Sequence, residues 1–191
     1  ANNKITIRRA LAYTSILCFL AFIILIQFNL FTILLGLGSM FLAFTYPFMK
    51  RITYWPQLFL GLTFNWGIIM AWAAFDNSIS LEIVLLYISA IFWTLGYDTI
   101  YGAQDMSDDE IIGLKSTSIK FKENIKLFVS MSYMITILIM VYLFWESIKF
   151  NFFSFIFLLF TISLIYQIIK FDKNNSNTCL KMFKINNLSG L

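Results

Sequence analysis

The sequence predicts an all-α fold, a polytopic bundle of transmembrane helices, and three observations lead to this class. Hydrophobic residues make up 60% of the 191 residues, charged residues only 13%, and the mean hydropathy is +0.79. An average soluble domain is less apolar and carries about 25% charged residues. The apolar runs are continuous and lack the alternation of barrel strands. Helices are therefore expected, because a helix satisfies its own backbone polar groups in lipid.

Six apolar runs are long enough to cross the hydrocarbon core of a membrane, which takes about 20 residues of helix. Short polar turns separate most of them, and a longer acid-rich loop, Asp98 to Lys126, separates the fourth run from the fifth. We therefore expect one domain with six membrane-spanning helices over residues 1–191. The six runs are Leu11 to Gln27, Leu30 to Phe48, Gln57 to Phe75, Ile79 to Tyr97, Leu127 to Trp145 and Phe150 to Ile169.

The basic residues indicate how the bundle is oriented. Thirteen of the fourteen Lys and Arg residues lie on the side that holds the chain start, the acid-rich loop and the tail, and only Lys149 lies on the other side. By the positive-inside rule the first side faces the cytoplasm. The net charge of +4 thus reflects topology and gives no indication of nucleic-acid binding, while Lys181 and Lys184 in the tail are expected to contact anionic lipid headgroups. The thirteen residues are Lys4, Arg8, Arg9, Lys50, Arg51, Lys115, Lys120, Lys122, Lys126, Lys170, Lys173, Lys181 and Lys184.

The residue types present restrict the chemistry that the chain can perform. There is no His, and the two cysteines, Cys18 and Cys179, are far apart in the sequence. The usual zinc sites and imidazole acid–base catalysis are therefore excluded, and a disulfide framework is not indicated. Any catalysis must use Asp, Glu, Lys, Arg, Tyr or Asn side chains.

Five acidic residues gather at the end of the fourth apolar run, between Gly96 and Thr117. On a continuous helix Asp98 and Asp105 would share a face about 10 Å apart, with Tyr101 between them. The next two aspartates follow at spacings that again bring side chains together, and like charges so arranged repel unless a cation lies among them. Carboxylates without His or Cys suit magnesium or calcium. Because the spacing of an EF-hand is absent, magnesium with a phosphate ligand is the better fit.

A structural interpretation of part of this stretch is also open. Ser107 followed by Asp108, Asp109 and Glu110 is typical of a helix start, where capping side chains and acids interact with free backbone amides. Asp98 is different because it directly follows an apolar span, where an ionisable residue is costly unless it has a function. Asp98 is therefore the strongest candidate for a functional residue.

The segment YDTIYGAQDMSDDEIIGLKST resembles the second aspartate-rich motif, D-x-x-Y-x-x-x-D, of the UbiA superfamily of intramembrane prenyltransferases. Asp98, Tyr101 and Asp105 occupy its three defining positions. A second segment, YPFMKRITYWPQLFLGLTFNWGIIMAWAA, is similar to the branch of the family that acts on 4-hydroxybenzoate. Together the two segments cover about residues 46 to 118. Outside this window the resemblance is one of span number and hydropathy.

The resemblance implies nine transmembrane helices, with a first aspartate-rich motif, N-D-x-x-D-x-x-x-D, ahead of the third. This sequence has no acid before Asp76. The six spans would then be helices three to eight, without the first two helices and the last one. We therefore expect residues 1–191 to be an inactive fragment of an enzyme whose active site lies at the cytoplasmic or matrix face of a bacterial or mitochondrial inner membrane.

The activity that the resemblance implies is the transfer of a polyprenyl group from polyprenyl diphosphate to 4-hydroxybenzoate. This reaction belongs to ubiquinone synthesis and is assisted by Mg²⁺. Asp98, Tyr101 and Asp105 would be the catalytic residues, and Asp98, Asp105 and Asp109 would hold the metal. A separation of about two helical turns is too large for Asp98 and Asp105 to grip one ion directly, which favours separate ions or water-bridged contacts.

Four further residues are candidates for substrate binding. Lys50 and Arg51 lie on the same side of the membrane as the acids and could bind diphosphate, although both are also typical of anchors at a helix end. Lys115 follows the acids closely enough to meet the same diphosphate or only to balance their charge. Asn65 lies mid-span in LGLTFNWGI, where its amide needs a partner, either the bound benzoate or a neighbouring helix.

Three other function classes stay open. A family member with another aromatic or lipid acceptor would share the same motifs. A cation-coupled transporter would also place acids at helix ends, but it would usually show paired broken helices at the membrane midplane, and the sequence shows no such pair. A purely structural membrane subunit would have no activity that depends on Asp98 or Asp105.

Overall fold

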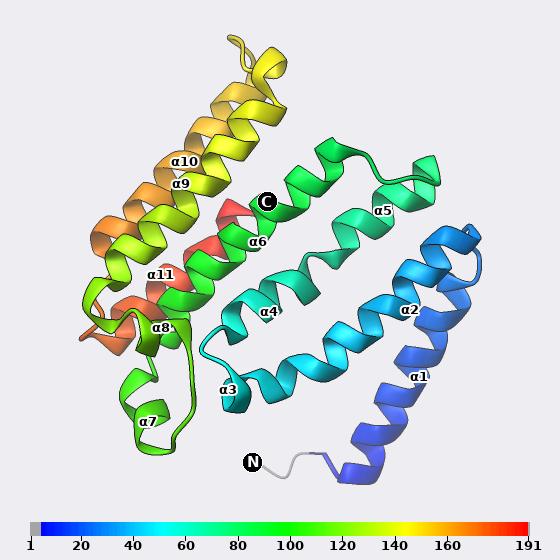
Figure 1. The fold of residues 1–191 in the computed structure, drawn as a ribbon, viewed down its shortest axis with the longest axis horizontal. Coiled ribbons are helices and arrows are strands. Elements are labelled where there is room, and N and C mark those ends of the chain that lie inside the picture. Colours follow the sequence, from blue (N-terminus) through cyan, green and yellow to red (C-terminus); the bar gives the residue numbers. More distant parts are fainter. Residues whose placement is uncertain (1–4, 191) are drawn as a thin grey trace.

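The structure is a computed structural model that describes residues 5–190, so Lys4 lies outside the described residues. The described chain is helical and contains no strand, and six helical segments are long and apolar enough to cross a membrane (Figure 1). The all-α fold class and the number of spans are confirmed. The six segments are α1 (Ile7–Leu25), α2 with η1 and α3 (Leu30–Ile52), α4 with α5 (Pro56–Asp76), α6 (Leu81–Gly102), η2 with α9 (Lys122–Leu143) and α10 (Phe152–Lys170).

Shorter helices build the composite spans and the segments between them. Of these, α3, α7 and α8 gather at one end of the bundle (Figure 1), which we call the loop end. The components of the composite spans and the remaining helices are α2 (Leu30–Thr45), η1 (Tyr46–Phe48), α3 (Met49–Ile52), α4 (Pro56–Phe64), α5 (Trp66–Asp76), α7 (Met106–Ile111), α8 (Thr117–Lys120), η2 (Lys122–Asn124), α9 (Ile125–Leu143), η3 (Trp145–Ser147) and α11 (Ser176–Ser189).

Local capping chemistry fixes where several spans begin and end. Asn29, Ser80 and Asn151 each accept a hydrogen bond from a backbone N–H in the first turn of α2, α6 and α10, which satisfies amides that have no partner within the helix. Asn77 ends α5 in the left-handed conformation, with φ of 54°. The spans therefore begin and end at residues whose side chains or backbone conformation are suited to helix termini.

The third span is broken at Asn65, a feature that the continuous apolar run did not predict. The backbone leaves the helical conformation there, with φ of −89° and ψ of 1°. The side-chain nitrogen of Asn65 donates to the carbonyl oxygens of Gly61 (2.9 Å) and Ala90 (3.2 Å) and to the hydroxyl of Thr94 (2.8 Å). One amide thus closes the end of α4 and also ties the break to α6.

The helix α6 lies at the centre of the packing and contacts α4, α9 and α11. Its approach to α9 depends on Gly96, because a Cβ atom at this position would overlap the ring of Tyr133. Tyr133 is itself buried and donates from its hydroxyl to Gln167 Oε1 of α10 at 2.7 Å. The ring of Tyr133 therefore fills the space that a side chain in place of Gly96 would occupy. Its hydroxyl links α10 to the packing of α6 against α9.

The tail after α10 forms a helix that was not predicted from the sequence. This helix, α11, packs along α6 and α10. Asn186 of α11 accepts from Trp93 Nε1 and donates to Gln167 Oε1, both at 3.2 Å. Trp93 lies nine residues before the end of α6, which places Asn186 about 13 Å inside that span. A polar segment can lie there because its amides are paired with buried partners.

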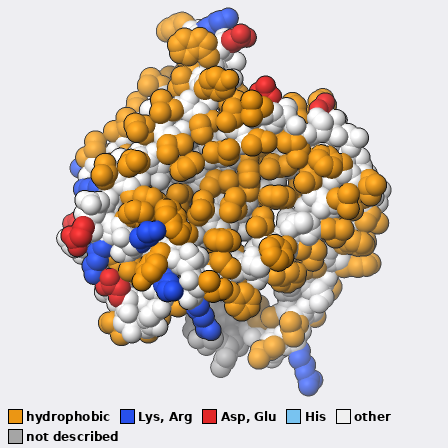
Figure 2. Space-filling model, viewed as in Figure 1, with side chains coloured by type: hydrophobic (Ala, Val, Ile, Leu, Met, Phe, Trp, Pro, Cys, Tyr) orange, Lys and Arg blue, Asp and Glu red, His pale blue; other side chains and the backbone are white. Residues whose placement is uncertain are grey.

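Packing is much looser at the edge of the bundle that α1 forms. No residue of α1 is buried, and α1 contacts only α2 to any extent. The space-filling view shows a broad hydrophobic surface across the middle of the molecule, with charged side chains near its rim (Figure 2). This distribution is the one expected of a protein whose middle contacts lipid tails and whose ends contact water.

Candidate active site at the loop end of α6

The acids at the loop end do not lie on one helix. The helix α6 ends at Gly102, a turn follows, and Asp105 stands at the N-terminus of the separate helix α7. The shared helical face expected for Asp98 and Asp105 is therefore wrong, since the chain changes direction between them. The spacing within α7 is as predicted, and the backbone N–H of Asp109 donates to the carbonyl of Asp105 at 2.9 Å.

Asp98 is a half-buried carboxylate in the last turns of α6. Lys50 of α3 and Tyr46 of η1 lie close enough to interact electrostatically with it. A carboxylate withdrawn from water in this way interacts more strongly with a fixed cation than an exposed one does, because solvent screens the pair less. The structure therefore places Asp98 within electrostatic range of Lys50.

Asp105 and Tyr101 are the two other residues of the motif. Asp105 is exposed and accepts a long hydrogen bond, 3.4 Å, from Gln104 Nε2. The other end of the Gln104 amide, Oε1, is buried and has no hydrogen-bond partner among the described residues. Tyr101 is 37% exposed, and its ring lies 4.6 Å from that of Phe183, so α11 forms part of the wall beside the motif.

Basic side chains approach the acids from α3 and from the end of the acidic loop. Lys50 Nζ lies 3.8 Å from Asp109, whose side chain is largely buried, and the adjacent Arg51 is exposed. The backbone N–H of Lys115 donates to the carbonyl of Lys50 at 2.8 Å. The ammonium group of Lys115 donates to the carbonyl oxygen of Ile52 at 3.2 Å. The predicted cations Lys50, Arg51 and Lys115 are thus brought to one place.

Asn65 lies deeper than the other predicted residues. Its partner Thr94 precedes Asp98 by one helical turn, about 6 Å along α6. The side-chain nitrogen of Asn65 is already used by three acceptors in α4 and α6. The helix-contact interpretation of Asn65 therefore has direct geometric support, and any contact with a benzoate would have to use its oxygen.

Buried hydroxyl and amide groups beside the acids were not singled out from the sequence. They tie the segment that follows α7 to the ends of α4 and α6 through hydrogen bonds of 2.7 to 2.9 Å. The available signals were a glutamine at the start of an apolar span and three consecutive hydroxyl residues directly after Lys115. The residues are Gln57, Thr99, Thr117 and Ser118.

The donor atoms at this end suit a hard divalent cation in kind. Carboxylates and a free amide oxygen, Gln104 Oε1, are the ligand types that magnesium prefers. Within residues 5–190, however, no three acidic or other ligating side chains come together closely enough to hold a metal, so Asp98, Asp105 and Asp109 do not form a closed site by themselves. This open arrangement fits magnesium, which commonly takes one or two carboxylates and completes its shell with substrate phosphates.

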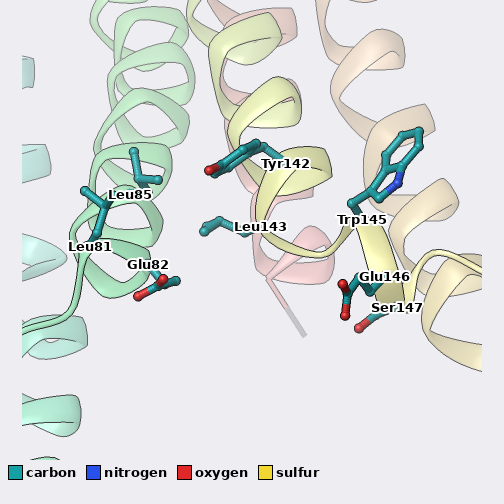
Figure 3. A pocket seen from close by; sticks show the side chains of 8 residues that line it. All are labelled: Leu81, Glu82, Leu85, Tyr142, Leu143, Trp145, Glu146 and Ser147. Carbon is teal, nitrogen blue, oxygen red and sulfur yellow. The ribbon is translucent and has the colours of Figure 1, made fainter.

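A cavity of about 560 Å³ lies elsewhere, at the far end of α6. Leu81 begins α6, seventeen residues before Asp98, so this cavity is about 25 Å from the acids of the loop end. Glu82 comes from α6 and Glu146 from η3, on opposite sides of the cavity, with Tyr142 and Trp145 nearby (Figure 3). The cavity has acids without basic side chains in its lining, so it lacks the means to bind a diphosphate.

Comparison with known proteins identifies the family. Residues 1–188 match the UbiA prenyltransferase family. The chain belongs to this family. This confirms the resemblance carried by the two segments around Lys50 and Asp98, and extends it over nearly the whole chain.

Curated relatives carry a more specific name. The chain is 47% identical over 131 residues to "4-hydroxybenzoate polyprenyltransferase, mitochondrial" of Drosophila melanogaster, a match that covers 68% of this chain and 33% of the relative. It is 55% identical over 108 residues to the human protein of the same name, covering 56% of this chain and 29% of the relative. The chain thus spans about a third of the length of these relatives.

A solved structure shows the same fold. A UbiA homolog from Aeropyrum pernix K1 in its apo form superimposes with a TM-score of 0.75 and 21% sequence identity, covering 98% of this chain and 73% of that chain. The six apolar helices and the mitochondrial relatives together identify the chain as part of an integral membrane protein.

Proposed function

We propose that the whole protein is an intramembrane aromatic prenyltransferase that moves a polyprenyl group from polyprenyl diphosphate to 4-hydroxybenzoate, a step in ubiquinone synthesis. The observation that carries the proposal is the half-buried carboxylate of Asp98 beside Lys50 at one end of a membrane span. An apolar donor tail can lie in the bilayer while its diphosphate meets these charges at the surface. The names of the curated relatives support the choice of donor and acceptor.

The proposed reaction separates charge, and the residues at the loop end are of the types that this requires. The allylic carbon–oxygen bond of the donor breaks, and the diphosphate keeps the electron pair. The ring carbon ortho to the hydroxyl of 4-hydroxybenzoate then bonds to the allylic carbon, and that ring carbon loses its proton. Lys50, Arg51 and Lys115 would bind the diphosphate through charge-assisted hydrogen bonds, and the ring of Tyr101 would face the allylic cation.

Magnesium is part of the proposal. Asp98, Asp105 and Asp109 would hold magnesium through separate ions or water-bridged contacts with the diphosphate, and further ligands would come from the first acidic motif that the family resemblance implies for the whole protein. A bound magnesium ion neutralises charge on the leaving diphosphate, which makes it a better leaving group.

We further propose that the loop end faces the cytoplasm, or the matrix if the membrane is mitochondrial. Among residues 5–190, the loop end carries the cations of α3 and of the segment that follows α7, whereas Lys149 lies in the turn between η3 and α10 at the opposite end. The orientation follows from the positive-inside rule. It would make the acidic site accessible to water-soluble 4-hydroxybenzoate and magnesium from that compartment.

The test is a substitution in the whole protein, assayed in membranes for magnesium-dependent prenylation of 4-hydroxybenzoate. Asp98→Ala is expected to lower the rate by about 10²-fold or more, the usual size of an electrostatic contribution to a charged transition state. Asp105→Ala is expected to lower the rate as well. Asp76→Ala, an exposed acid at the opposite end of α5, is the control. Full activity in the Asp98 variant would remove the basis of the proposal.

Two alternatives have distinct outcomes in the same assay. A family member with another aromatic or lipid acceptor would release diphosphate only with that acceptor, and the Asp98 dependence would remain. A cation-coupled transporter would show no prenylation at all. The break at Asn65 is a feature of transporter helices, but the other described spans are not broken at their middle, so the paired breaks of such proteins are not seen.

A further inference from the structure

The acidic loop is fixed at both ends by groups that lie inside the bundle. Its start is continuous with α6, and its end is the segment Lys115–Ser118, which returns to the same place. We propose that Gln57, with Thr99, Thr117 and Ser118, forms a brace that positions the acidic loop for magnesium and diphosphate. This inference rests on the proposed function, and it assigns Gln57 as a positioning residue.

The brace is a small buried hydrogen-bond network. Gln57 Oε1 accepts from the backbone N–H of Thr117 at 2.9 Å, and the hydroxyls of Thr117 and Thr99 lie 2.7 Å apart. The hydroxyl of Ser118 donates to the carbonyl of Thr99 at 2.8 Å. Gln57 is 3% exposed, and the other three are fully buried. Three segments distant in sequence are thereby joined at one point.

Two members of the brace lie close in sequence to candidate site residues. Thr99 directly follows Asp98, and Thr117 lies two residues after Lys115. Lys115 in turn bonds through its backbone N–H to the carbonyl of Lys50. The brace therefore fixes the positions of the carboxylate and of two cations relative to one another, although no member of it is among the charged groups.

The fit around the brace leaves little freedom for adjustment. A Cβ atom at Gly102 would lie 2.7 Å from Ser118 Oγ and 3.0 Å from Gln57 Nε2. The end of α6 thus touches both partners without an intervening side chain. Since close packing transmits small displacements, a shift of Gln57 or Ser118 would move the turn that carries Asp105.

Aromatic residues that flank the brace in the sequence pack against one another. The ring of Trp55, two residues before Gln57, lies 5.7 Å from that of Phe121 at an angle of 71°, and Phe121 stacks on Phe128 at 4.0 Å. The ammonium group of Lys120 lies 4.4 Å from the centre of the Trp55 ring. These contacts join the segments that flank the brace, and burial of the brace itself makes each of its hydrogen bonds stronger and costlier to break.

Apolar residues could fill the same volume, so a specific role must explain why polar side chains occupy these buried positions. A buried hydrogen bond contributes modestly to stability, but it is directional, and leaving one partner unpaired is costly. The brace therefore selects one register between the loop and the bundle. Positioning errors of about 1 Å can reduce catalysis by about 10²-fold even when they arise away from the reacting atoms.

The test uses binding of an unreactive donor, farnesyl S-thiolodiphosphate, to the whole protein, as well as turnover. Gln57→Leu and Thr117→Val keep the approximate shape and remove the polar groups of the brace. We expect each to raise the Kd of the analogue, and the magnesium concentration for half-maximal binding, by about tenfold. Thr117→Ser keeps the hydroxyl and should restore both values to within about twofold.

A matched control separates positioning from stability. Thr136→Val removes another buried hydroxyl of the bundle, which donates to Ser89 O and Ser132 O at 3.2 and 3.1 Å, about 13 Å along α6 from Asp98. We expect this variant to lower the melting temperature about as much as Thr117→Val does and to leave binding unchanged. Equal losses of stability with an unchanged Kd in the brace variants would overturn the positioning role.

Different results would overturn the proposed function and the positioning role of Gln57. If the unaltered protein shows no magnesium-dependent binding of the analogue, the proposed function falls, and the positioning role falls with it. If the unaltered protein binds normally and Gln57→Leu and Thr117→Val bind equally well, only the positioning role is overturned. Should Gln57→Leu fail to fold, the comparison of Thr117→Val with Thr117→Ser decides the matter.

Discussion

The two ends of α6 carry acidic residues in contrasting surroundings. At the loop end, Asp98 is half-buried near Lys50, and Asp109 is buried with Lys50 beside it. At the far end, Glu82 and Glu146 are exposed and line an open cavity with aromatic residues (Figure 3). Two acids from each end can therefore be compared. They differ in burial and in the presence of a fixed cation.

The difference shows which surroundings make acidic residues of this molecule suitable for a functional site. An exposed carboxylate is already well solvated, so an ion pair with another side chain contributes little there. A carboxylate held partly out of water next to a lysine has fewer competing water contacts and a defined place in the structure. We therefore expect burial and a fixed cation to make the acids of the loop end functional, and substitutions away from these features to have smaller effects.

The largest effect is expected from the packing beneath Asp98. Gly96→Val would force a side chain into the ring of Tyr133, which is held by Gln167. We expect the free energy of unfolding to fall by about 1–3 kcal/mol or more, because overpacking a filled core displaces neighbours. Unfolding in detergent, followed by thermal or denaturant titration, measures this. Gly67→Val, where a new Cβ meets open space, is the control; a similar loss there would contradict the packing argument.

A smaller effect is expected from Lys50. Lys50→Gln removes the cation next to Asp98 and Asp109, and we expect kcat/KM for the diphosphate donor to fall by about tenfold, or about 1.4 kcal/mol, typical of one charge-assisted contact. Lys122→Gln is the control, because its pair with Glu110, although shorter at 2.7 Å, joins two exposed side chains. Surface pairs of that kind contribute about 0–1 kcal/mol. Equal losses in the two variants would break the comparison.

The neighbouring acids of α7 provide a finer test. Asp109 is 8% exposed and Asp108 is exposed. Asp109→Asn should therefore lower activity several-fold and raise the magnesium requirement, since it removes the charge that Lys50 faces. Asp108→Asn should change neither value by more than about twofold. Titration of the initial rate with magnesium chloride gives both numbers, and a reversed order would show that burial does not decide which acid acts.

The smallest effect is expected at the far end of α6. The double variant Glu82→Gln and Glu146→Gln removes both acids of the cavity while keeping their size. We expect prenylation, its magnesium dependence and the melting temperature to stay within error of the unaltered protein, because these exposed acids lie about 25 Å from Asp98. A clear loss of activity in this variant would mean that the far cavity belongs to the reaction.

Local chemistry explains why much of the fold could be predicted. Hydropathy depends on each segment alone, so the six spans were identifiable from sequence, with boundaries that differ from the helices by a few residues. The same holds for Asp98, since an acid at the end of an apolar span is conspicuous wherever its neighbours lie. The motif spacing that indicated the family is likewise a property of the sequence.

The features that were missed depend on partners distant in the sequence. The break at Asn65 is stabilised by Ala90 and Thr94 of another helix, and no local signal separates it from a continuous span. The brace joins Gln57 to Thr117, which lies 60 residues later. The error over Asp105 has a local cause: the motif spacing was placed on a continuous helix, whereas α6 ends at Gly102.

The helix α11 has a consequence for biogenesis. An apolar span can partition into the bilayer as soon as it leaves the ribosome, because its side chains alone favour lipid over water. The segment Ser176–Ser189 has no such preference, and the side-chain partners of Asn186 are Trp93 of α6 and Gln167 of α10. This segment can therefore pack in its place only after α6 and α10 have come together, so its insertion follows theirs during synthesis.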